Sequence, residues 1–599
     1  MSAAGLHDPQ GGLEPPYDSP VKTARNIAAD SHRECPMSSS HDQPGDGSVA
    51  LAPVFAGSAA AAQTRLQAAL MQGEAAARAA AVATQGEFAI GLTDAANART
   101  FLAVDRFSIR TLCYRVHEGR LLFAERADDL AETNAELDPQ AIFDYLFFHC
   151  IPSPRTIFKG VYRLPPGHYA WFEGGKLTVE PYWVPTFIEP TRPVSFDSLK
   201  SEFRQHVQDA VARQLDGSVP ACFLSGGTDS STVAGMVGQV TGQPAHTYSI
   251  GFEAEGYDEM SFARLVAAHF KTQHHEYYVT PDDLVRSIPT VARYYDQPFG
   301  NSSALPTYYC AKFAQGNGVT HLLAGDGGDE LFGGNSRYAK QRVFGWYAHI
   351  PGWVRSGLMQ PLIEGTPLGK LPGFSKARSY IEQAKVPMPD RLQMYNLLLR
   401  LGLQDVLTAD FLAQVNTNGP SELQRRVWSL AKADSELNRT LAYDWRFTLA
   451  DSDLPKVRGT TSLAGVSVGF PFLDDALTTF SCRLPDDYKL KGLNLRWFFK
   501  EALRGFLPDE TIAKKKQGFG LPFGVWAMRH APLKALAVES LRSLGQRGIV
   551  RPEFIKTLVD QRLPEHPGYY GEMVWILMML EQWLQGRQAG ARFTAAAPA

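Results

Sequence analysis

Cysteine is scarce in this chain, and its spacing argues against two common kinds of stabilising site. Only six of the 599 residues are cysteines, and no two of them form a C-x-x-C pair. We therefore expect neither a zinc site nor a disulfide framework. Long apolar runs are also missing, so no transmembrane helix is expected. Cys222 lies in a short apolar run and is expected to be a buried free thiol.

The chain also lacks a strong charge of either sign. Its formal net charge is −3, which argues against nucleic acid or an anionic membrane as a partner. Basic residues gather only locally, at 489–500 and 514–516. The N-terminal residues show no apolar core behind a basic start, the pattern of a secretory signal. We therefore expect a cytoplasmic protein that binds neither nucleic acid nor membrane.

Its amino-acid composition divides the chain into an N-terminal tail and two domains. Residues 1–48 are rich in Pro, Gly and Ser without apolar periodicity and are expected to be a disordered tail. The Ala-rich stretch 56–83 favours a helix. Residues 49–190 are expected to form a small α+β domain. A Pro-rich linker near 184–196 separates it from a second domain at 195–588.

Short β-type runs between turn residues predict the sheet of the first domain. The expected strands are 86–94, 99–106, 111–119 and 120–126. A helix is expected over 138–149, with Asp138 as its N-cap and Pro139 in its first position. A hairpin with a Gly-Gly turn is expected over 165–183.

The second domain alternates strands and helices, which is typical of a doubly wound parallel sheet. The expected strands are 220–224, 245–252, 274–279 and a run that starts at 319, and the expected helices are 198–215 and 258–270. From about 336 to 585 the chain is expected to be mostly helical. Ligands of such sheets bind at the carboxyl ends of the strands, so the loops that follow the strands are the candidate sites.

One such loop has the sequence FLSGGTDSST, from Phe223 to Thr232. Its glycines let the backbone approach an anion, Ser225 and Ser230 add hydroxyls, and the following helix adds free N–H groups. The loop lacks the lysine of a kinase-type phosphate loop and carries the acid Asp229 there instead. An acid beside a phosphate requires a metal between them. The alternative is an ordinary glycine turn before a helix.

Two further stretches carry charge next to glycines. GDGGDELFGG, at 325–334, sets three acids among glycines after a buried strand, and its Asp329 is a natural ligand for a phosphate-bound metal. The alternative is a solvated acidic turn. AKKKQGFGLPFG, at 513–524, places Lys516 before a glycine-aromatic turn, where it can neutralise phosphate charge. A solvated basic helix end is the alternative for that stretch.

Together these motifs resemble the asparagine synthetase family in its glutamine-dependent type. The stretches 257–284, 471–492 and 498–526 are also similar, and the resemblance extends over about 85–590. It implies a glutaminase-like domain of the N-terminal-nucleophile type, then a synthetase domain of the ATP-pyrophosphatase type with a helical C-terminal part. The implied reaction is adenylation of a substrate carboxylate by ATP with release of pyrophosphate. A nitrogen nucleophile then displaces AMP.

The resemblance also implies roles for individual residues. Pyrophosphate would be held by Ser225, Gly226, Gly227, Asp229 and Ser230, Mg²⁺ by Asp229 and Asp329, and adenosine by Phe223, Leu224, Ile250, Ala324 and Gly325. Asp326 would be a general base near the attacking nitrogen. Lys516 would stabilise the charge that develops during adenylation and amide formation.

The chain departs from the family pattern in both domains. The family needs a cysteine at position 2, where this chain has Ser2, and Ala83 replaces the acid that grips the glutamine amino group. We therefore expect no glutamine hydrolysis. Ser467 and Gly469 replace a Glu and an Arg of the family pattern, which is expected to open the acyl-substrate side of the cleft and argues against free aspartate as substrate. Thr228 replaces a usually apolar residue of the pyrophosphate loop.

We therefore expect an ATP-dependent amide ligase. Its partners would be a small-molecule or peptide carboxylate and either ammonia or a substrate amine, and a homodimer is compatible with the resemblance. β-Lactam synthetase and lasso-peptide cyclases are relatives that use a tethered amine. The alternatives are asparagine synthesis with external ammonia or glutamine, a lasso-type macrolactam cyclase, and a nucleotide-binding pseudoenzyme scaffold. The intact Asp229, Asp329 and Lys516 argue against the scaffold.

Overall fold

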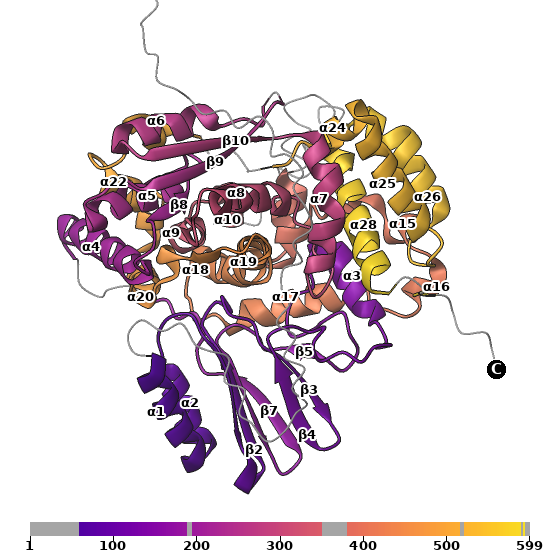
Figure 1. The fold of residues 1–599 in the computed structure, drawn as a ribbon, viewed down its shortest axis with the longest axis horizontal. Coiled ribbons are helices and arrows are strands. Elements are labelled where there is room, and N and C mark those ends of the chain that lie inside the picture. Colours follow the sequence, from indigo (N-terminus) through magenta and orange to yellow (C-terminus); the bar gives the residue numbers. More distant parts are fainter. Residues whose placement is uncertain are drawn as a thin grey trace, which may run out of the picture. The chain divides into compact units, whose positions relative to one another are not determined.

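The computed structural model describes residues 59–188, 194–254, 256–349, 380–515, 520–588 and 591–593. It confirms the expected mixed fold class: an N-terminal part built on antiparallel strands, a parallel sheet, and a helical C-terminal part (Figure 1). The expected disordered tail, 1–48, lies outside the described residues. In the described ranges, every helix is too short or too polar to serve as a bilayer-spanning segment.

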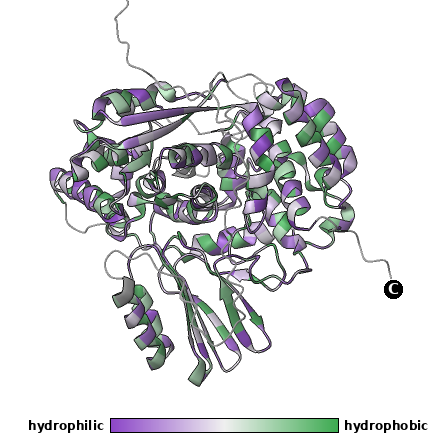
Figure 2. Ribbon diagram, viewed as in Figure 1, coloured by the Kyte–Doolittle hydropathy of each residue, from purple (hydrophilic) through white to green (hydrophobic). Residues whose placement is uncertain are grey.

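The N-terminal part is built on two stacked antiparallel sheets, with helices packed beside them. The first sheet has the order β1-β2-β6-β7, with β1 (Ala89–Asp94), β2 (Arg99–Val104), β6 (His168–Glu173) and β7 (Lys176–Pro181). Helices α1 (Ala59–Gln72) and α2 (Glu74–Val82) share one core with its first face, through Leu66, Phe88 and Trp171. Its other face packs on the sheet β4-β3-β5, formed by β3 (Cys113–His117), β4 (Arg120–Ala124) and β5 (Tyr162–Arg163). Figure 2 shows hydrophobic residues along much of these strands.

Local signals in the N-terminal part are mostly confirmed. Helix α3 (Pro139–Phe148) begins at the predicted proline, and the Asp138 side chain accepts a hydrogen bond from the Gln140 N–H at 2.9 Å. The β6–β7 hairpin turns at Gly174 and Gly175, whose φ angles of 58° and 78° fit the left-handed turn that joins two strands. The Ala-rich stretch 56–83 is helical over Ala59–Gln72 and Glu74–Val82, as expected, and Gly73, with a φ of 103°, divides it into α1 and α2.

The parallel sheet has the order β10-β9-β8-β11-β12, and all neighbouring strands run parallel. Its strands are β8 (Ala221–Phe223), β9 (His246–Phe252), β10 (Gln273–Val279), β11 (His321–Leu323) and β12 (Ser467–Gly469). Helices α4 (Phe196–Gln214), α5 (Thr228–Thr241) and α6 (Met260–Phe270) share a core with one face, and α8 (Ala304–Gly316) packs on the other. The sheet is doubly wound, as predicted, but β12 comes from a region that was expected to be helical.

The remaining elements, α7 between β10 and α8 and those after β11, are helical apart from β12 and one short hairpin. They are α7 (Pro281–Tyr294), α9 (Gly328–Phe332), α10 (Ser336–His349), η4 (Asp390–Gln393), α14 (Leu397–Leu401), α15 (Leu403–Val406), α16 (Ala409–Leu412), α17 (Gly419–Leu430), α18 (Glu436–Asp444), the π-helix η5 (Trp445–Asp453), α19 (Leu454–Leu463), η6 (Pro471–Leu473), α20 (Asp475–Arg483), α21 (Asp486–Lys489), β13 (Leu490–Lys491), β14 (Asn494–Leu495), α22 (Trp497–Leu503), α23 (Asp509–Ala513), α24 (Phe523–Arg529), α25 (Ala531–Leu544), α26 (Pro552–Thr557), the π-helix η7 (Leu558–Arg562), α27 (Leu563–Glu565) and α28 (Pro567–Arg587). Helix α28 is buried along most of its length, and its Glu581 pairs with the buried Arg547 at 2.5 Å.

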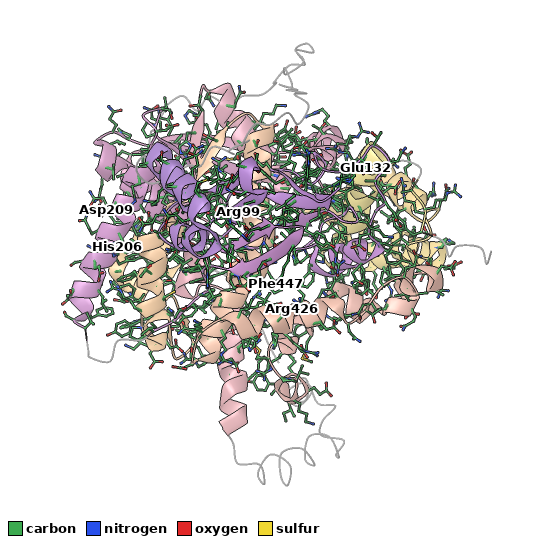
Figure 3. The ribbon with its side chains drawn as sticks, turned by 90° about the horizontal axis from the view of Figure 1, so that it is seen from below. Arg99, Glu132, His206, Asp209, Arg426 and Phe447 are labelled. Atoms are coloured by element: carbon green, nitrogen blue, oxygen red, sulfur yellow. The ribbon has the colours of Figure 1, made fainter. Side chains whose placement is uncertain are left out.

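The N-terminal part shares packing with the helical part. The Tyr145 hydroxyl of α3 donates to the Ile576 carbonyl of α28 at 2.8 Å. Phe148 stacks on Phe447 of η5, which is labelled in Figure 3, with ring centroids 5.2 Å apart. All five described cysteines are buried and free, which confirms the prediction for Cys222.

Candidate functional site

The loop between β8 and α5 has the tight geometry that its glycines predict. Gly226 has a φ of 69°, and a Cβ atom there would lie 2.4 Å from the backbone carbon of Phe262. Gly227 stands before the 14-residue helix α5 and has no side chain with which to cap its first N–H groups. A loop of this kind presents backbone donors and the positive end of the helix dipole to an anion.

Two serines fix the shape of this loop. The Ser225 N–H donates to the Ser230 Oγ at 3.1 Å, and the two Oγ atoms lie 3.0 Å apart. The Leu224 N–H donates to the Tyr248 carbonyl of β9 at 2.9 Å, which anchors the start of the loop to the sheet. The predicted pyrophosphate residues therefore form one connected turn at the end of β8.

The second glycine- and acid-rich loop lies against the first. Leu323 of β11 pairs with Cys222 of β8, so the two loops follow neighbouring strands. A Cβ atom on Gly325 would lie 2.7 Å from the Ser230 backbone nitrogen, which shows that the loops touch. The chain runs outward from β8 to β10 and then returns to the other side of β8, so the loops meet at the switch point of the sheet. Open α/β sheets bind their ligands at this point.

The residues predicted to line an adenosine site lie in or directly after the C-terminal halves of neighbouring strands. Phe223, Leu224 and Ile250 belong to β8, its loop and β9, while Ala324 and Gly325 follow β11. The Ala324 N–H donates to the Gly469 carbonyl of β12 at 2.9 Å. The structure thus brings the five residues to one edge of the sheet.

Arg496 joins the two predicted metal ligands and was not predicted. Its Nη1 atom donates to Asp229 Oδ2 at 2.8 Å and to Asp329 Oδ1 at 2.7 Å, and its Nη2 atom bonds Asp229 Oδ1. Its side chain is only 7% exposed. The basic stretch 489–500 contains this residue, but nothing in the spacing links it to loops about 170 and 270 positions earlier.

Glycines make room for this ion cluster. A Cβ atom on Gly328 would lie 2.0 Å from Asp229 Oδ1, and one on Gly334 would lie 1.7 Å from Asp329 Oδ1. Both distances are far below van der Waals contact, so neither position tolerates a side chain while the carboxylates stay in place. The second glycine-rich motif is therefore shaped around the two acids.

Asp326 lies beside a cation that was not predicted. The Lys456 Nζ atom is 3.7 Å from Asp326 Oδ1 and 2.9 Å from Asp453 Oδ1. Removal from water raises the pKa of Asp326 to about 6, Lys456 opposes this rise, and Asp453 and Asp229 add to it. A carboxylate with a pKa near neutrality suits proton transfer at physiological pH.

The predicted lysine, Lys516, lies outside the described residues. A neighbour, Lys514, does reach the first loop: its Nζ is 3.5 Å from the Ser225 carbonyl oxygen and 3.3 Å from Glu259 Oε1. Burial lowers the pKa of Lys514. A lysine of the basic stretch therefore lies beside the loop, while the role of Lys516 stays a prediction.

The structure shows no opening at Gly469, contrary to the expectation. A Cβ atom there would lie 2.3 Å from the Gln214 Oε1 atom, because the Gln214 side chain fills this space. The same side chain also donates from Nε2 to Glu87 Oε1 of the N-terminal part at 3.4 Å. Ser467 lies at the edge of the sheet, where its Oγ is 2.8 Å from His321 Nδ1. The lost Glu and Arg thus leave a filled surface at Gly469.

A separate cavity of about 210 Å³ lies between α3 and α17. Arg155 on its wall already pairs with Asp138 at 2.7 Å and Asp144 at 3.1 Å, and Arg426, labelled in Figure 3, lies on its α17 side. No residue of the two loops lines it, so it does not belong to the candidate site.

Comparison with known proteins matches both parts of the chain. The asparagine synthase family model matches residues 202–585, and the glutamine amidotransferase domain model matches residues 63–183. Glutamine-hydrolyzing asparagine synthetase 1 of Bacillus subtilis is 26% identical over 492 residues, which are 80% of this chain and 74% of that protein. Asparagine synthetase 3 of the same organism is 25% identical over 454 residues (72% and 67%). Amidase chry2 of Gibberella zeae is 24% identical over 491 residues (74% and 70%).

Proposed function

Because the chain belongs to the asparagine synthase family, and is thus a carbon–nitrogen ligase that uses ATP to form an amide, we propose that it activates a substrate carboxylate by adenylation. The main support for adenylation is the contact between the 224–230 loop and the 325–334 loop at the switch point of the sheet. Backbone donors, hydroxyls and two carboxylates there form a site suited to a metal-bound polyphosphate.

The residues present fit Mg²⁺. Asp229 and Asp329 offer the hard oxygen ligands that this ion prefers, and the two carboxylates already converge on one cation, Arg496. No group of three or more His, Cys, Asp or Glu side chains in the described ranges is arranged to hold a metal alone, so phosphate oxygens and water would complete the ligand set. When bound, Mg²⁺ would neutralise the charge of the leaving pyrophosphate.

The first step joins carboxylate and nucleotide. A substrate carboxylate oxygen attacks the α-phosphorus of ATP, the bond to the β-phosphate oxygen breaks, and pyrophosphate leaves. The 224–230 loop would bind pyrophosphate through its backbone N–H groups and through Ser225 and Ser230. Lys516 would stabilise the negative charge that develops on the phosphate oxygens.

The second step makes the amide. A nitrogen attacks the acyl carbon, the bond to AMP breaks, and one proton leaves the nitrogen. Asp326 would take that proton, because its pKa of about 6 leaves it largely ionised at pH 7 yet basic enough to accept. Lys456 would hold the Asp326 carboxylate in position through their 3.7 Å contact.

The nitrogen donor proposed is ammonia or a substrate amine. Ala83 ends α2 as an exposed, neutral side chain, so this position offers no acid to a glutamine amino group. The acyl donor proposed is a small-molecule or peptide carboxylate other than free aspartate, because Ser467 and Gly469 supply no charged partner for an amino acid.

The test is exchange of labelled pyrophosphate into ATP, run with aspartate and with a panel of other carboxylates. We expect exchange that depends on one class of carboxylate and that falls about 100-fold or more in Asp229→Ala. Exchange with aspartate alone would instead favour asparagine synthesis from ammonia. Binding of ATP without exchange for any carboxylate would refute adenylation and favour a scaffold.

A further inference from the structure

Arg496 occupies the position between two carboxylates that the proposed reaction gives to a divalent cation. Its guanidinium bonds both Asp229 and Asp329 through the same nitrogen, Nη1, at 2.8 and 2.7 Å. A guanidinium and a divalent cation cannot both fill this position, since each needs the same oxygen atoms. The arrangement therefore represents a state that must change before a metal ion can bind to both acids.

Three features hold Arg496 in this state. Its guanidinium lies 4.0 Å above the Phe499 ring, which favours a cation. Its backbone has a φ of 56°, a conformation that residues other than glycine rarely adopt, at the start of α22. Its Nη1 also donates to the Thr228 hydroxyl at 2.9 Å. Arg496 thus combines a rare backbone conformation with hydrogen bonds to three acceptor side chains.

Thr228 gives this arrangement a feature specific to the chain. The family pattern described above has an apolar residue at this place in the loop, which could not accept the bond. Because the hydroxyl accepts from a charged donor, it favours the position of Arg496 between the acids over any other. The substitution of Thr228 for an apolar residue therefore acts on the metal site through Arg496.

Arg496 also has an unused donor. Its Nε atom is buried and has no hydrogen-bond partner among the described residues. A buried donor without a partner is unfavourable and marks a place where an anionic oxygen would be stabilised. A polyphosphate entering beside the two acids would offer such oxygens to the guanidinium while it brings the metal ion.

We propose that Arg496, positioned by Thr228, is an internal counter-ion that holds Asp229 and Asp329 until a divalent cation arrives together with a polyphosphate. The inference rests on the proposed function, which assigns these two acids to the cation. Its consequence is that the metal ion alone binds poorly, because it must displace Arg496 without offering it a new partner. Thr228 and Arg496 are thus positioning residues that couple metal binding to nucleotide binding.

The experiment titrates the full chain with Mn²⁺ in the absence of nucleotide and follows free Mn²⁺ by electron paramagnetic resonance. We expect Thr228→Val, which removes the hydroxyl at nearly constant volume, to bind Mn²⁺ roughly fivefold to tenfold more tightly than the wild type. Thr228→Ser keeps the acceptor and is expected to match the wild type. Arg496→Gln is expected to show the largest gain.

Adding Asp329→Asn to Thr228→Val should abolish the gain, which assigns it to this site. Equal or weaker Mn²⁺ affinity in Thr228→Val, with circular dichroism showing a folded protein, overturns the inference even if Arg496→Gln fails to fold. The titration needs no turnover, so it is independent of pyrophosphate exchange. If Thr228→Val binds Mn²⁺ more tightly but the protein exchanges no pyrophosphate, the counter-ion role of Arg496 stands and adenylation is refuted. If pyrophosphate exchanges but Thr228→Val gains no Mn²⁺ affinity, adenylation stands and the counter-ion role is refuted.

Discussion

Replacing Lys456 with Met tests the role of Asp326 most directly. The Lys456 ammonium lies 3.7 Å from the Asp326 carboxylate, whose side chain is 23% exposed. At an effective dielectric constant of about 20, such a contact is worth about 4 kcal/mol. Solvent screening at this partly exposed carboxylate reduces the figure to about 2–3 kcal/mol, or roughly two pKa units.

The sign of the effect follows from the charge removed. Lys456 favours the ionised form of Asp326, so its loss raises the pKa of Asp326 from about 6 to roughly 8. At pH 7 the ionised fraction would then fall from roughly 90% to roughly 10%. We therefore expect amide formation in Lys456→Met to be about ninefold slower at pH 7 and to recover above pH 9.

The assay measures single-turnover amide formation between pH 5 and 10, with Lys456→Arg as the matched variant that keeps a cation. The acid limb of the pH profile should move up by about two units in Lys456→Met and stay in place in Lys456→Arg. Pyrophosphate exchange does not use Asp326 and should keep its pH dependence. A loss of rate that is the same at every pH would refute the assignment of Asp326 as the base.

Three further outcomes are expected. Burial raises the pKa of Glu87 to about 7, with Asp105 adding to the rise. The folded state therefore disfavours ionised Glu87, so the stability associated with this group is fully present below pH 4.5 and is lost as the pH rises through 7. Glu87→Gln removes this loss. In urea unfolding it should raise the free energy of unfolding by up to about 3 kcal/mol at pH 8 and by less than about 1 kcal/mol at pH 5. Gly334→Ala should abolish pyrophosphate exchange and lower stability by roughly 1–3 kcal/mol, because its Cβ would lie 1.7 Å from Asp329 Oδ1. The control Gly345→Ala, with no heavy atom within 4 Å of its Cβ, should leave exchange unchanged and raise stability by up to about 1 kcal/mol, as alanine does in place of glycine inside a helix. Glutamine should yield no glutamate by mass spectrometry, and stoichiometric release would contradict the reading of Ala83.

Local chemistry predicted most of the scaffold. The glycine loops at 223–232 and 325–334 stood out because few structures need glycines, acids and hydroxyls together, and the switch point of the sheet brings them into contact. The N-cap of α3 and the β6–β7 turn were readable for the same reason, since each depends on two or three adjacent residues. Strand β12 was missed because three residues carry no usable periodicity.

Interactions between distant segments could not be predicted from the sequence. Nothing near Arg496 states that it bonds two acids on other loops, and nothing near Gly469 states that Gln214 fills the space beside it. Lys456 was overlooked because it lies on a helix with no motif, and only the fold sets it against Asp326. Cations that reach a site from distant segments are thus harder to predict than the acids and glycines of the loops themselves.

The packing of α3 bears on how this chain can be shortened. Phe143 and Tyr145 are completely buried in the same core as Trp575 and Trp583 of α28. A truncated chain that starts after the N-terminal sheets would expose that face of α28 to water and lose the bond from Tyr145 to Ile576. Deletion of the N-terminal part therefore removes a wall of the ligase core, and such a truncation is expected to aggregate whatever chemistry the N-terminal part itself performs.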